Sequence, residues 1–521
     1  MVETMEELCE KFLKLEKKHN LNQKMIKKVY YWQLLRMELY NELSRKTGIY
    51  SSVGQQTSLG LKDKVISFIP FLKNSLLANP FKGKYQKDIL IFDHPRKVKI
   101  ENVGFQDIYS YFLSDVLNKN EFELIETPYL NQHTKEKKNY IKYNDKIILG
   151  SYFNRKISFF KTCETFNKKV QRIEEDIEKL FNVKVDLYKM IQQNILRFKY
   201  EYKQYDKLFK KRKPKLIFVV VGYENKSVIS AAKDNNIPIY ELQHGVINKF
   251  HMGYHYPNDK IDSIIYFPDK LLSFGEYWNT AADYPISKEN IIPIGFQYLE
   301  NNASKYLNNP NFNDNKLNNY NFNANNSKNN NFNDNKSNNN ENNKIIKGNE
   351  KNKKQIIVIS QRVIGKELSK FAYESAKSMK ENNFVYKLHP EEYFDWKNNY
   401  EYLNQAAKLD NFQVVDTNDS ELYELMSKSY YQLGVFSTAI YEGLYFGCKT
   451  FVLNIPGVEY LDDLYEKNYI EKVNTPEELI EKIQTQNLNL KEYDKEFFFK
   501  KYNKEEILKI ININNFIEKN K

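Results

Sequence analysis

The chain has 521 residues, 41% of them hydrophobic and 15% aromatic, which is enough for about two to four packed domains and excludes wholesale disorder. Its 79 Lys and Arg against 67 Asp and Glu give a net charge of +12, which suits an anionic partner but selects none. Cys9, Cys163 and Cys448 are odd in number and widely spaced, so a disulfide framework and a cysteine zinc site are excluded and a reducing, cytoplasmic setting is favoured. Neither a secretion signal nor a run of about 20 apolar residues is present.

Residues 1–87 are predicted to form a helical, basic N-terminal extension. Between Lys11 and Leu43, basic residues are interleaved with apolar ones such as Phe12, Trp32 and Leu35. An interfacial helix that docks on anionic lipid has this pattern. A helix packed on the following domain has it too, so both interpretations stay open.

Residues 88–300 alternate between predicted strands and helices. The strands are Asp88–Phe92, Phe122–Ile125, Lys146–Gly150, Leu216–Gly222 and Ile237–Leu242, and the helices are Val103–Leu117, Lys168–Lys207 (one or two helices) and Asn225–Asn235. The last two strands and the helix between them predict parallel strands with a right-handed crossover. This region is therefore expected to be a first Rossmann-like domain.

Residues 301–353 are dominated by Asn and contain the hexapeptide NFNDNK twice, at Asn311–Lys316 and Asn331–Lys336. Asn favours turns over helix interiors and strands. Apolar residues are too few to offset the entropy cost of ordering the chain. We expect a disordered, low-complexity linker between two domains.

Residues 354–521 repeat the alternation and end in helices. The predicted strands are Gln355–Ser360, Phe384–Leu388, Phe412–Val415, Tyr430–Phe436 and Thr450–Leu453, and the predicted helices are Glu367–Glu381, Asp419–Lys428 (capped by Asp419 or Ser420), Ala439–Phe446 and one that begins after Thr475. Thr475-Pro476 supplies a helix cap followed by Pro in the first turn. The fold class predicted for the whole chain is α/β, with two doubly wound domains.

The sequence Gln243-His244-Gly245 follows directly after a predicted parallel strand. Ligands of open α/β sheets bind beyond the carboxyl ends of the strands, so His244 stands where function is expected. A neutral imidazole can accept a proton from a hydroxyl. The alternative is a loop histidine that is hydrogen-bonded to the backbone.

A metal site near this motif is disfavoured. His251 and His255 have the i, i+4 spacing of a helical zinc pair, but Gly253 and Pro257 argue against a helix, and the Glu of an HExxH motif is missing.

Polar residues also follow three predicted strands of the second half: Arg362 after the first, Lys387 and His389 at the second, and Ser437 and Thr438 at the start of a helix that also carries Glu442. A helix start with extra hydroxyl donors is suited to binding an anion. Arg362 can hold a pyrophosphate or a base edge, and Lys387 with His389 suits a phosphate. A surface arginine, a strand-end turn and an ordinary helix cap are the alternatives. Neither GxxxxGK[ST] nor GxGxxG occurs.

With these motifs in this order, the chain resembles the capsule and surface-polysaccharide glycosyltransferases of the GT-B fold, from about Asp88 to Glu300 and from Lys354 to about Gln484. The matching stretches are Asp88–Phe92 with Arg96, Gln243–Gly245, Gly253–Tyr254, Tyr256–Pro257, Leu272–Trp278, Ile294–Gly295, Lys387–Pro390, Phe436–Thr438 and Glu442–Gly443. It is also similar to polysialyltransferase-like enzymes and CDP-glycerol glycerophosphotransferases, which pair a His-Gly, a His-Pro and a serine-rich turn.

The resemblance implies two Rossmann-like domains facing a cleft and transfer of a sugar from a nucleotide-sugar to a glycan or lipid-linked glycan. It implies His244 as the catalytic base, with Gln243, Gly245, Tyr254 and Tyr256 on the acceptor side. The implied donor-binding residues are Arg362, Lys387, His389, Ser437, Thr438 and Glu442. No metal is expected, because helix N–H groups, Lys387 and His389 would neutralise the donor phosphates. No cofactor is expected either, because the nucleotide-sugar is a substrate. Gln243 replaces the Trp usual in the glycerophosphotransferases, which favours a sugar donor.

Two alternatives remain. The same sites would serve transfer of glycerophosphate or another phospho-alditol from a CDP-linked donor, and a non-catalytic glycan-assembly factor would merely bind glycan. Nucleic acid is not expected as a partner, because the charge is diffuse and no RNA-binding motif occurs. The expected location is the cytoplasm, with the N-terminal helices as a candidate contact to the cytoplasmic face of the membrane.

Overall fold

The computed structural model describes residues 4–49, 70–82, 87–95, 97–100, 104–129, 138–158, 160–307, 354–417 and 422–511, together with Val2 and His133. Arg96, the predicted caps Asp419 and Ser420, and the Asn-rich segment after residue 307 lie outside the described residues.

The first domain is built on a parallel seven-stranded sheet with the order β11-β10-β9-β8-β3-β6-β7. Its strands are β3 (Ile89–Phe92), β6 (Phe122–Glu126), β7 (Ile141–Tyr143), β8 (Leu216–Val220), β9 (Ile239–Leu242), β10 (Lys270–Ser273) and β11 (Ile291–Pro293). Alternate residues of β8 enter separate cores: Phe218 packs with α4 (Leu113–Val116), and Val219 packs with α7 (Leu187–Arg212) and α8 (Lys226–Asp234). Burial on both faces explains why these strands read as continuous apolar runs.

The second domain is built on a parallel six-stranded sheet with the order β14-β13-β12-β15-β16-β17. Its strands are β12 (Lys354–Ile359), β13 (Asn382–Lys387), β14 (Phe412–Val415), β15 (Ser429–Gly434), β16 (Lys449–Leu453) and β17 (Glu471–Val473). The helices include α11 (Gly365–Ser378), α13 (Glu401–Ala406), α14 (Leu422–Lys428), α15 (Thr438–Tyr445) and α17 (Pro476–Thr485), and Thr475 caps α17 as predicted. The predicted fold class, α/β with two doubly wound domains, is confirmed.

Each sheet grows outward in both directions from one pair of neighbouring strands. In the first sheet that pair is β3 and β8, and in the second it is β12 and β15. The loops beyond the carboxyl ends of such a pair diverge to opposite sides and leave a crevice, where ligands of these folds bind. The position of the two pairs therefore fixes where a site is expected in each domain.

The domains are joined by a shared hydrophobic cluster. The hydroxyls of Tyr277 and Tyr441 lie 3.3 Å apart across the interface, and Trp278 Nε1 donates to the Phe498 carbonyl at 2.7 Å. After α18 (Lys495–Phe498) the chain returns to the first domain, where Ile507 of α19 (Lys504–Ile511) enters the core beneath the first sheet. The last described helix thus belongs to the first domain in space, and its assignment to the second domain with the rest of residues 354–521 was wrong.

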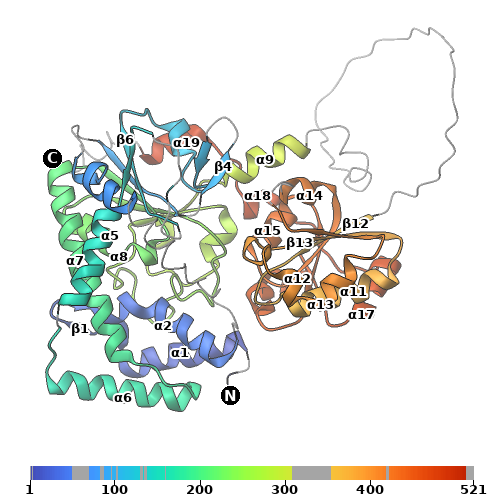
Figure 1. The fold of residues 1–521 in the computed structure, drawn as a ribbon, viewed down its shortest axis with the longest axis horizontal. Coiled ribbons are helices and arrows are strands. Elements are labelled where there is room, and N and C mark those ends of the chain that lie inside the picture. The colour runs from blue at the N-terminus through green and yellow to red at the C-terminus, as the bar shows by residue number, and fades with distance from the viewer. Residues whose placement is uncertain are drawn as a thin grey trace, which may run out of the picture.

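The N-terminal helices α1 (Met5–His19) and α2 (Tyr31–Thr47) pack against α6 (Glu164–Phe181) and α7 (Figure 1). Phe12, Trp32 and Leu35 are all 0% exposed. The apolar side chains that a lipid-binding helix would insert are therefore in the protein core, which favours the packed-helix interpretation. Among the described residues, no helix has both the length and the apolar composition needed to cross a bilayer.

A buried ion pair ties this N-terminal module to the first domain. Arg36 is 1% exposed, and its Nε and Nη2 donate to Glu16 Oε1 and Oε2 at 2.7 and 2.8 Å. Arg36 Nη1 also donates to the Met252 carbonyl, and the guanidinium lies 4.1 Å from the centre of the Tyr256 ring. Arg36 thereby anchors the loop that follows the His244 motif.

Three further sequence-based assignments were wrong. The strand predicted at Lys146–Gly150 lies within α5 (Asp145–Ile157), because a short apolar run does not distinguish a strand from a buried helix. Of the helix predicted at Val103–Leu117, only Leu113–Val116 is α-helical, and Gly104–Gln106 is strand β5, paired with β4 (Val98–Ile100). Residues 301–307, assigned to the linker, complete α9 (Gln297–Leu307).

Candidate functional site

His244 lies just beyond the carboxyl end of β9, beside the β3/β8 strand pair. Its half-buried imidazole is surrounded by aromatic rings from the loops after three strands. The centre of the His94 ring lies 6.3 Å away, that of Tyr109 6.2 Å and that of Tyr223 5.9 Å. His94 follows β3 and Tyr223 follows β8, so the crevice of the first sheet is lined by rings around one histidine.

A buried carboxylate and a tyrosine stand behind His244. Glu241 is 0% exposed, and its Oε1 accepts from the Tyr254 hydroxyl at 2.5 Å and from the Gly222 N–H at 2.8 Å. The Tyr254 oxygen lies 3.3 Å from His244 Nδ1. Because the Tyr254 hydroxyl donates its proton to Glu241, the Tyr254 oxygen can accept a hydrogen bond from His244 Nδ1–H. This arrangement favours the tautomer with the lone pair on Nε2.

Burial sets the protonation states of His244 and Glu241, which Tyr254 links by hydrogen bonds. Burial, with His251 and His94 nearby, holds the pKa of His244 well below its ordinary value, so the imidazole is neutral at neutral pH. Burial raises the pKa of Glu241 to about 7, opposed by the hydrogen bonds from Tyr254 and Gly222. Glu241 Oε2 is buried and has no partner among the described residues. A β-carbon on Gly222 would collide with that oxygen, which explains the glycine there.

The start of α15 faces this histidine loop from the second domain. Ser437 caps the helix, its Oγ accepting from Ala439 N–H at 3.2 Å. A β-carbon placed on Gly245 would lie 3.7 Å from Thr438 Oγ1. The structure therefore brings the Gln243–Gly245 motif and the Ser437–Thr438 turn together where the two domains meet. Ala439 and Ile440 N–H donate to Ser437 Oγ and to the Ser437 carbonyl, and the start of α15 carries the positive end of the helix dipole, which makes the turn suitable for an anion.

Glu442 lies one turn further into α15 and is 8% exposed. Burial raises its pKa to about 7, opposed by a hydrogen bond from Tyr423. The Tyr423 ring packs against Tyr298 of the first domain, with ring centres 5.8 Å apart. Glu442 is thus tied to the domain interface through a tyrosine.

The predicted acceptor-side residues other than Gly245 are buried. Gln243 is 1% exposed and links two loops, its Nε2 donating to the Gly245 carbonyl and its Oε1 accepting from Phe274 N–H, both at 2.8 Å. Tyr254 is 0% exposed and Tyr256 packs under Arg36. These three side chains support the histidine loop from within the fold.

Arg362 follows β12, Lys387 is the last residue of β13, and His389 comes two residues later. All three stand at the same end of the sheet as Ser437, but their side chains bond to other residues. Arg362 Nη2 lies 2.5 Å from Asp395 Oδ2, and Lys387 Nζ donates to the Tyr393 hydroxyl at 2.7 Å and to the Thr417 carbonyl. His389 Nδ1 accepts from the Glu391 N–H at 3.3 Å.

The structure adds four residues to those predicted: Glu241, His94, Tyr109 and Tyr223. The sequence could have indicated His94, because Asp93-His94 directly follows a predicted strand, as Gln243-His244 does. No sequence signal marked Tyr109, because its place beside His244 depends on the path of an irregular loop.

The histidines of the disfavoured metal motif are bonded to backbone. His251 Nδ1 accepts from Gly253 N–H at 3.2 Å, and His255 Nδ1 accepts from Asp283 N–H at 3.1 Å. Within the described ranges, no group of three or more histidine, cysteine or carboxylate side chains has the arrangement of a metal site.

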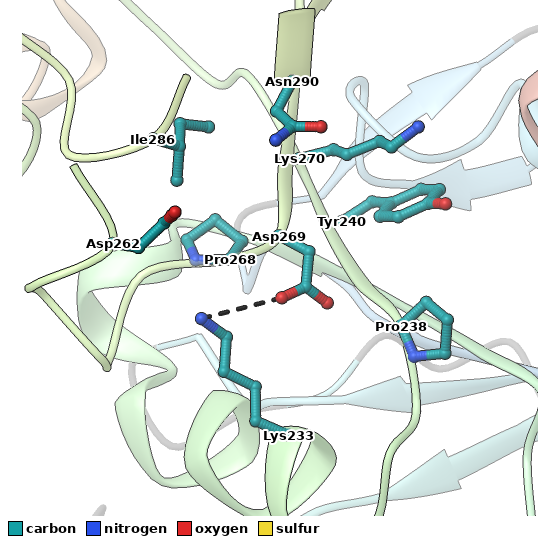
Figure 2. A pocket seen from close by; sticks show the side chains of 9 residues that line it. All are labelled: Lys233, Pro238, Tyr240, Asp262, Pro268, Asp269, Lys270, Ile286 and Asn290. Atoms are coloured by element: carbon teal, nitrogen blue, oxygen red, sulfur yellow. Dashed lines mark ion pairs between the residues drawn. The ribbon is translucent and has the colours of Figure 1, made fainter.

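A cavity of about 320 Å³ opens at the opposite end of the first sheet, where its parallel strands begin (Figure 2). It lies by Pro238 and Lys270, at the amino ends of β9 and β10, and Lys233 Nζ lies 3.6 Å from Asp269 Oδ1 on its wall. Because His244 follows the carboxyl end of β9, this cavity is separate from the cleft.

No family model and no curated protein matches the chain. Among solved structures, it is similar to the UDP-GlcNAc 2-epimerase from Methanocaldococcus jannaschii, at 11% identity and a TM-score of 0.44, over 81% of this chain and 98% of that one. The Neisseria meningitidis UDP-GlcNAc 2-epimerase bound to UDP-GlcNAc has 13% identity and a TM-score of 0.42, over 82% and 99%. A glycosyltransferase from Rickettsia africae has 14% identity and a TM-score of 0.36, over 84% and 97%.

Proposed function

We propose that the protein is a metal-independent glycosyltransferase that moves a sugar from a nucleotide-sugar to a hydroxyl of a surface polysaccharide, lipid-linked glycan or other glycan acceptor. The observation that carries the proposal is the approach of the Gly245 and Thr438 positions across the cleft. The loop that carries the neutral His244 thus lies beside a helix start, which suits acid–base chemistry next to an anionic leaving group.

On this proposal, His244 Nε2 takes the proton of the acceptor hydroxyl while that oxygen bonds to the anomeric carbon of the donor. The bond from the anomeric carbon to the phosphate oxygen breaks, and the nucleotide leaves with the electron pair. The N–H groups at the start of α15 and Thr438 Oγ1 stabilise the charge on the departing phosphate. Glu442, Arg362, Lys387 and His389 complete the donor site, and Arg362 exchanges its ion pair with Asp395 for the donor phosphate.

Replacing Glu241 with Gln is expected to lower kcat at least about tenfold and to change its pH dependence. The pKa of Glu241 is raised to about 7, so its carboxylate forms only as the pH rises through 7. The wild-type rate should therefore rise through that range, and the Gln variant should lose this limb of the kcat–pH profile. Tyr254→Phe should also lower kcat, because it removes the hydroxyl between Glu241 and His244.

Tyr284→Phe is the matched control for these two variants. Tyr284 is another tyrosine close to Glu241, but its hydroxyl donates to the Trp278 carbonyl at 2.5 Å. It should keep the wild-type pH profile. If the kcat–pH profile of Glu241→Gln equals that of the wild type, Glu241 has no part in the proposed mechanism.

The double variant Ser437→Ala, Thr438→Val is expected to weaken donor binding by about tenfold or more, since it removes the helix cap and a hydroxyl donor at the phosphate site. Titration calorimetry with the nucleotide-sugar measures this loss. Thr475→Ala removes a comparable cap from α17, away from the cleft, and should leave donor affinity unchanged.

The experiment that tests the proposed function is incubation with UDP-, CMP-, GDP- and CDP-linked donors and glycan acceptors, followed by product mass measurement. A glycosylated product supports the proposal. Transfer of glycerophosphate or another phospho-alditol from a CDP-linked donor would replace it with the alternative chemistry, and failure to bind any nucleotide would favour a non-catalytic glycan-assembly factor.

A further inference from the structure

Large apolar side chains project into solvent from two helices at the β7 edge of the first sheet. The first helix spans residues 70–77, and the second is α5. The exposed fractions are 42% for Leu72, 66% for Leu76, 63% for Leu77, 49% for Tyr152, 52% for Phe153 and 84% for Ile157. A soluble protein rarely leaves so many large apolar side chains together unless the surface binds something.

The end of helix 70–77 lies beside the start of α5. The Ala78 carbonyl, just after helix 70–77, accepts from Tyr143 N–H at 2.9 Å, two residues before α5 begins. Lys146 Nζ of α5 lies 5.5 Å from the centre of the Phe81 ring. The rings of Tyr152 and Phe153 are 5.7 Å apart, so the exposed aromatic side chains of α5 are contiguous.

Basic side chains accompany these apolar ones. Lys73, Lys146 and Lys156 are exposed, and Lys156 Nζ lies 5.7 Å from the centre of the Tyr152 ring. The only acidic residue on the two helices is Asp145, which is 0% exposed and accepts from His133 at 2.7 Å. We call the six apolar residues and these three lysines the apolar–basic surface; it exposes no acidic side chain on either helix.

We infer that the apolar–basic surface docks the protein on an anionic lipid bilayer. Leucine, isoleucine and aromatic side chains can enter the boundary between headgroups and acyl chains, while the lysines contact anionic headgroups. A second copy of the same surface is a poor occupant, because it would bring like charges together. The inference is independent of the proposed function, and it moves the membrane contact from the N-terminal helices, whose apolar side chains are buried, to α5 and helix 70–77.

Flotation with vesicles tests this on the full chain. Wild-type protein should bind vesicles of phosphatidylcholine mixed with phosphatidylglycerol, and bind vesicles of phosphatidylcholine alone at least about tenfold more weakly. Phe153→Asp with Ile157→Asp should lower binding to the anionic vesicles by about tenfold or more, and so should Lys146→Glu with Lys156→Glu. Ile261→Asp, at a site 59% exposed in the loop between β9 and β10, should bind like wild type.

Thermal unfolding and sedimentation equilibrium of the same variants exclude the other occupants. The substituted side chains are exposed, so both double variants should keep the wild-type midpoint and remain in the wild-type oligomeric state. Equal flotation of all variants overturns the inference. A large fall in midpoint for Phe153→Asp, Ile157→Asp also overturns it, because the chain itself would then cover the surface, and so does a wild-type oligomer that this variant dissociates.

Discussion

His244→Ala is expected to lower the rate of sugar transfer by about 10²- to 10⁴-fold, the usual contribution of a positioned general base. Donor affinity should change by less than about twofold, because His244 belongs to the first domain and the proposed phosphate site to the second. Single-turnover kinetics and titration calorimetry measure the two quantities separately.

Added imidazole provides the control for that variant. The substitution leaves space among the rings of His94, Tyr109 and Tyr223, and free imidazole at neutral pH can take the acceptor proton in place of the side chain. Partial recovery of transfer is expected. Wild-type transfer by His244→Ala without imidazole would exclude the residue as the base.

Arg36→Met is expected to lower the free energy of unfolding by about 3–5 kcal/mol, the cost of removing one partner of a buried ion pair. Glu16, 4% exposed, would be left charged in the core, and the Met252 carbonyl would lose its donor. Urea unfolding at neutral pH measures the loss. Because Arg36 anchors the loop that carries Tyr254, kcat should fall in the same variant.

Arg45→Met is the matched control for Arg36→Met. Arg45 pairs with Glu42 on the same helix at 2.6 Å, but its side chain is 47% exposed. Such pairs contribute less than about 1 kcal/mol. The double variant Glu16→Gln, Arg36→Met should recover part of the loss, since no buried charge remains. Equal destabilisation by the two Arg variants would show that the buried pair does not anchor the N-terminal module.

The fold could be predicted where the sequence pattern was long and unambiguous. Leu216–Val220 and Ile356–Ile359 are apolar runs buried on both faces, and the sequence pattern predicts a strand at each. The short strands β10 and β11 were not predicted, because runs of three or four residues among turns carry little pattern. The interleaved basic and apolar residues of the N-terminal helices suit lipid and protein equally, so only the packing decided between them.

The site was predicted in part. The rule that ligands bind beyond strand carboxyl ends identified His244, Ser437 and Thr438, and the structure brings the loops that carry them together. The rule does not say where a side chain points, so it could not show that Tyr254 is buried behind His244 or that Lys387 bonds to Tyr393. Glu241 faces inward on β9, and its part in the site depends on a tyrosine 13 residues later in the chain.

A crystal structure with the nucleotide-sugar that the donor panel identifies would be decisive. We expect the phosphates at the start of α15, bonded to backbone N–H groups and Thr438 Oγ1, and His244 Nε2 facing the anomeric carbon from the other side of the cleft. Phosphates bound instead between Lys233 and Lys270, in the cavity at the opposite sheet edge, would contradict a shared site between the two domains (Figure 2).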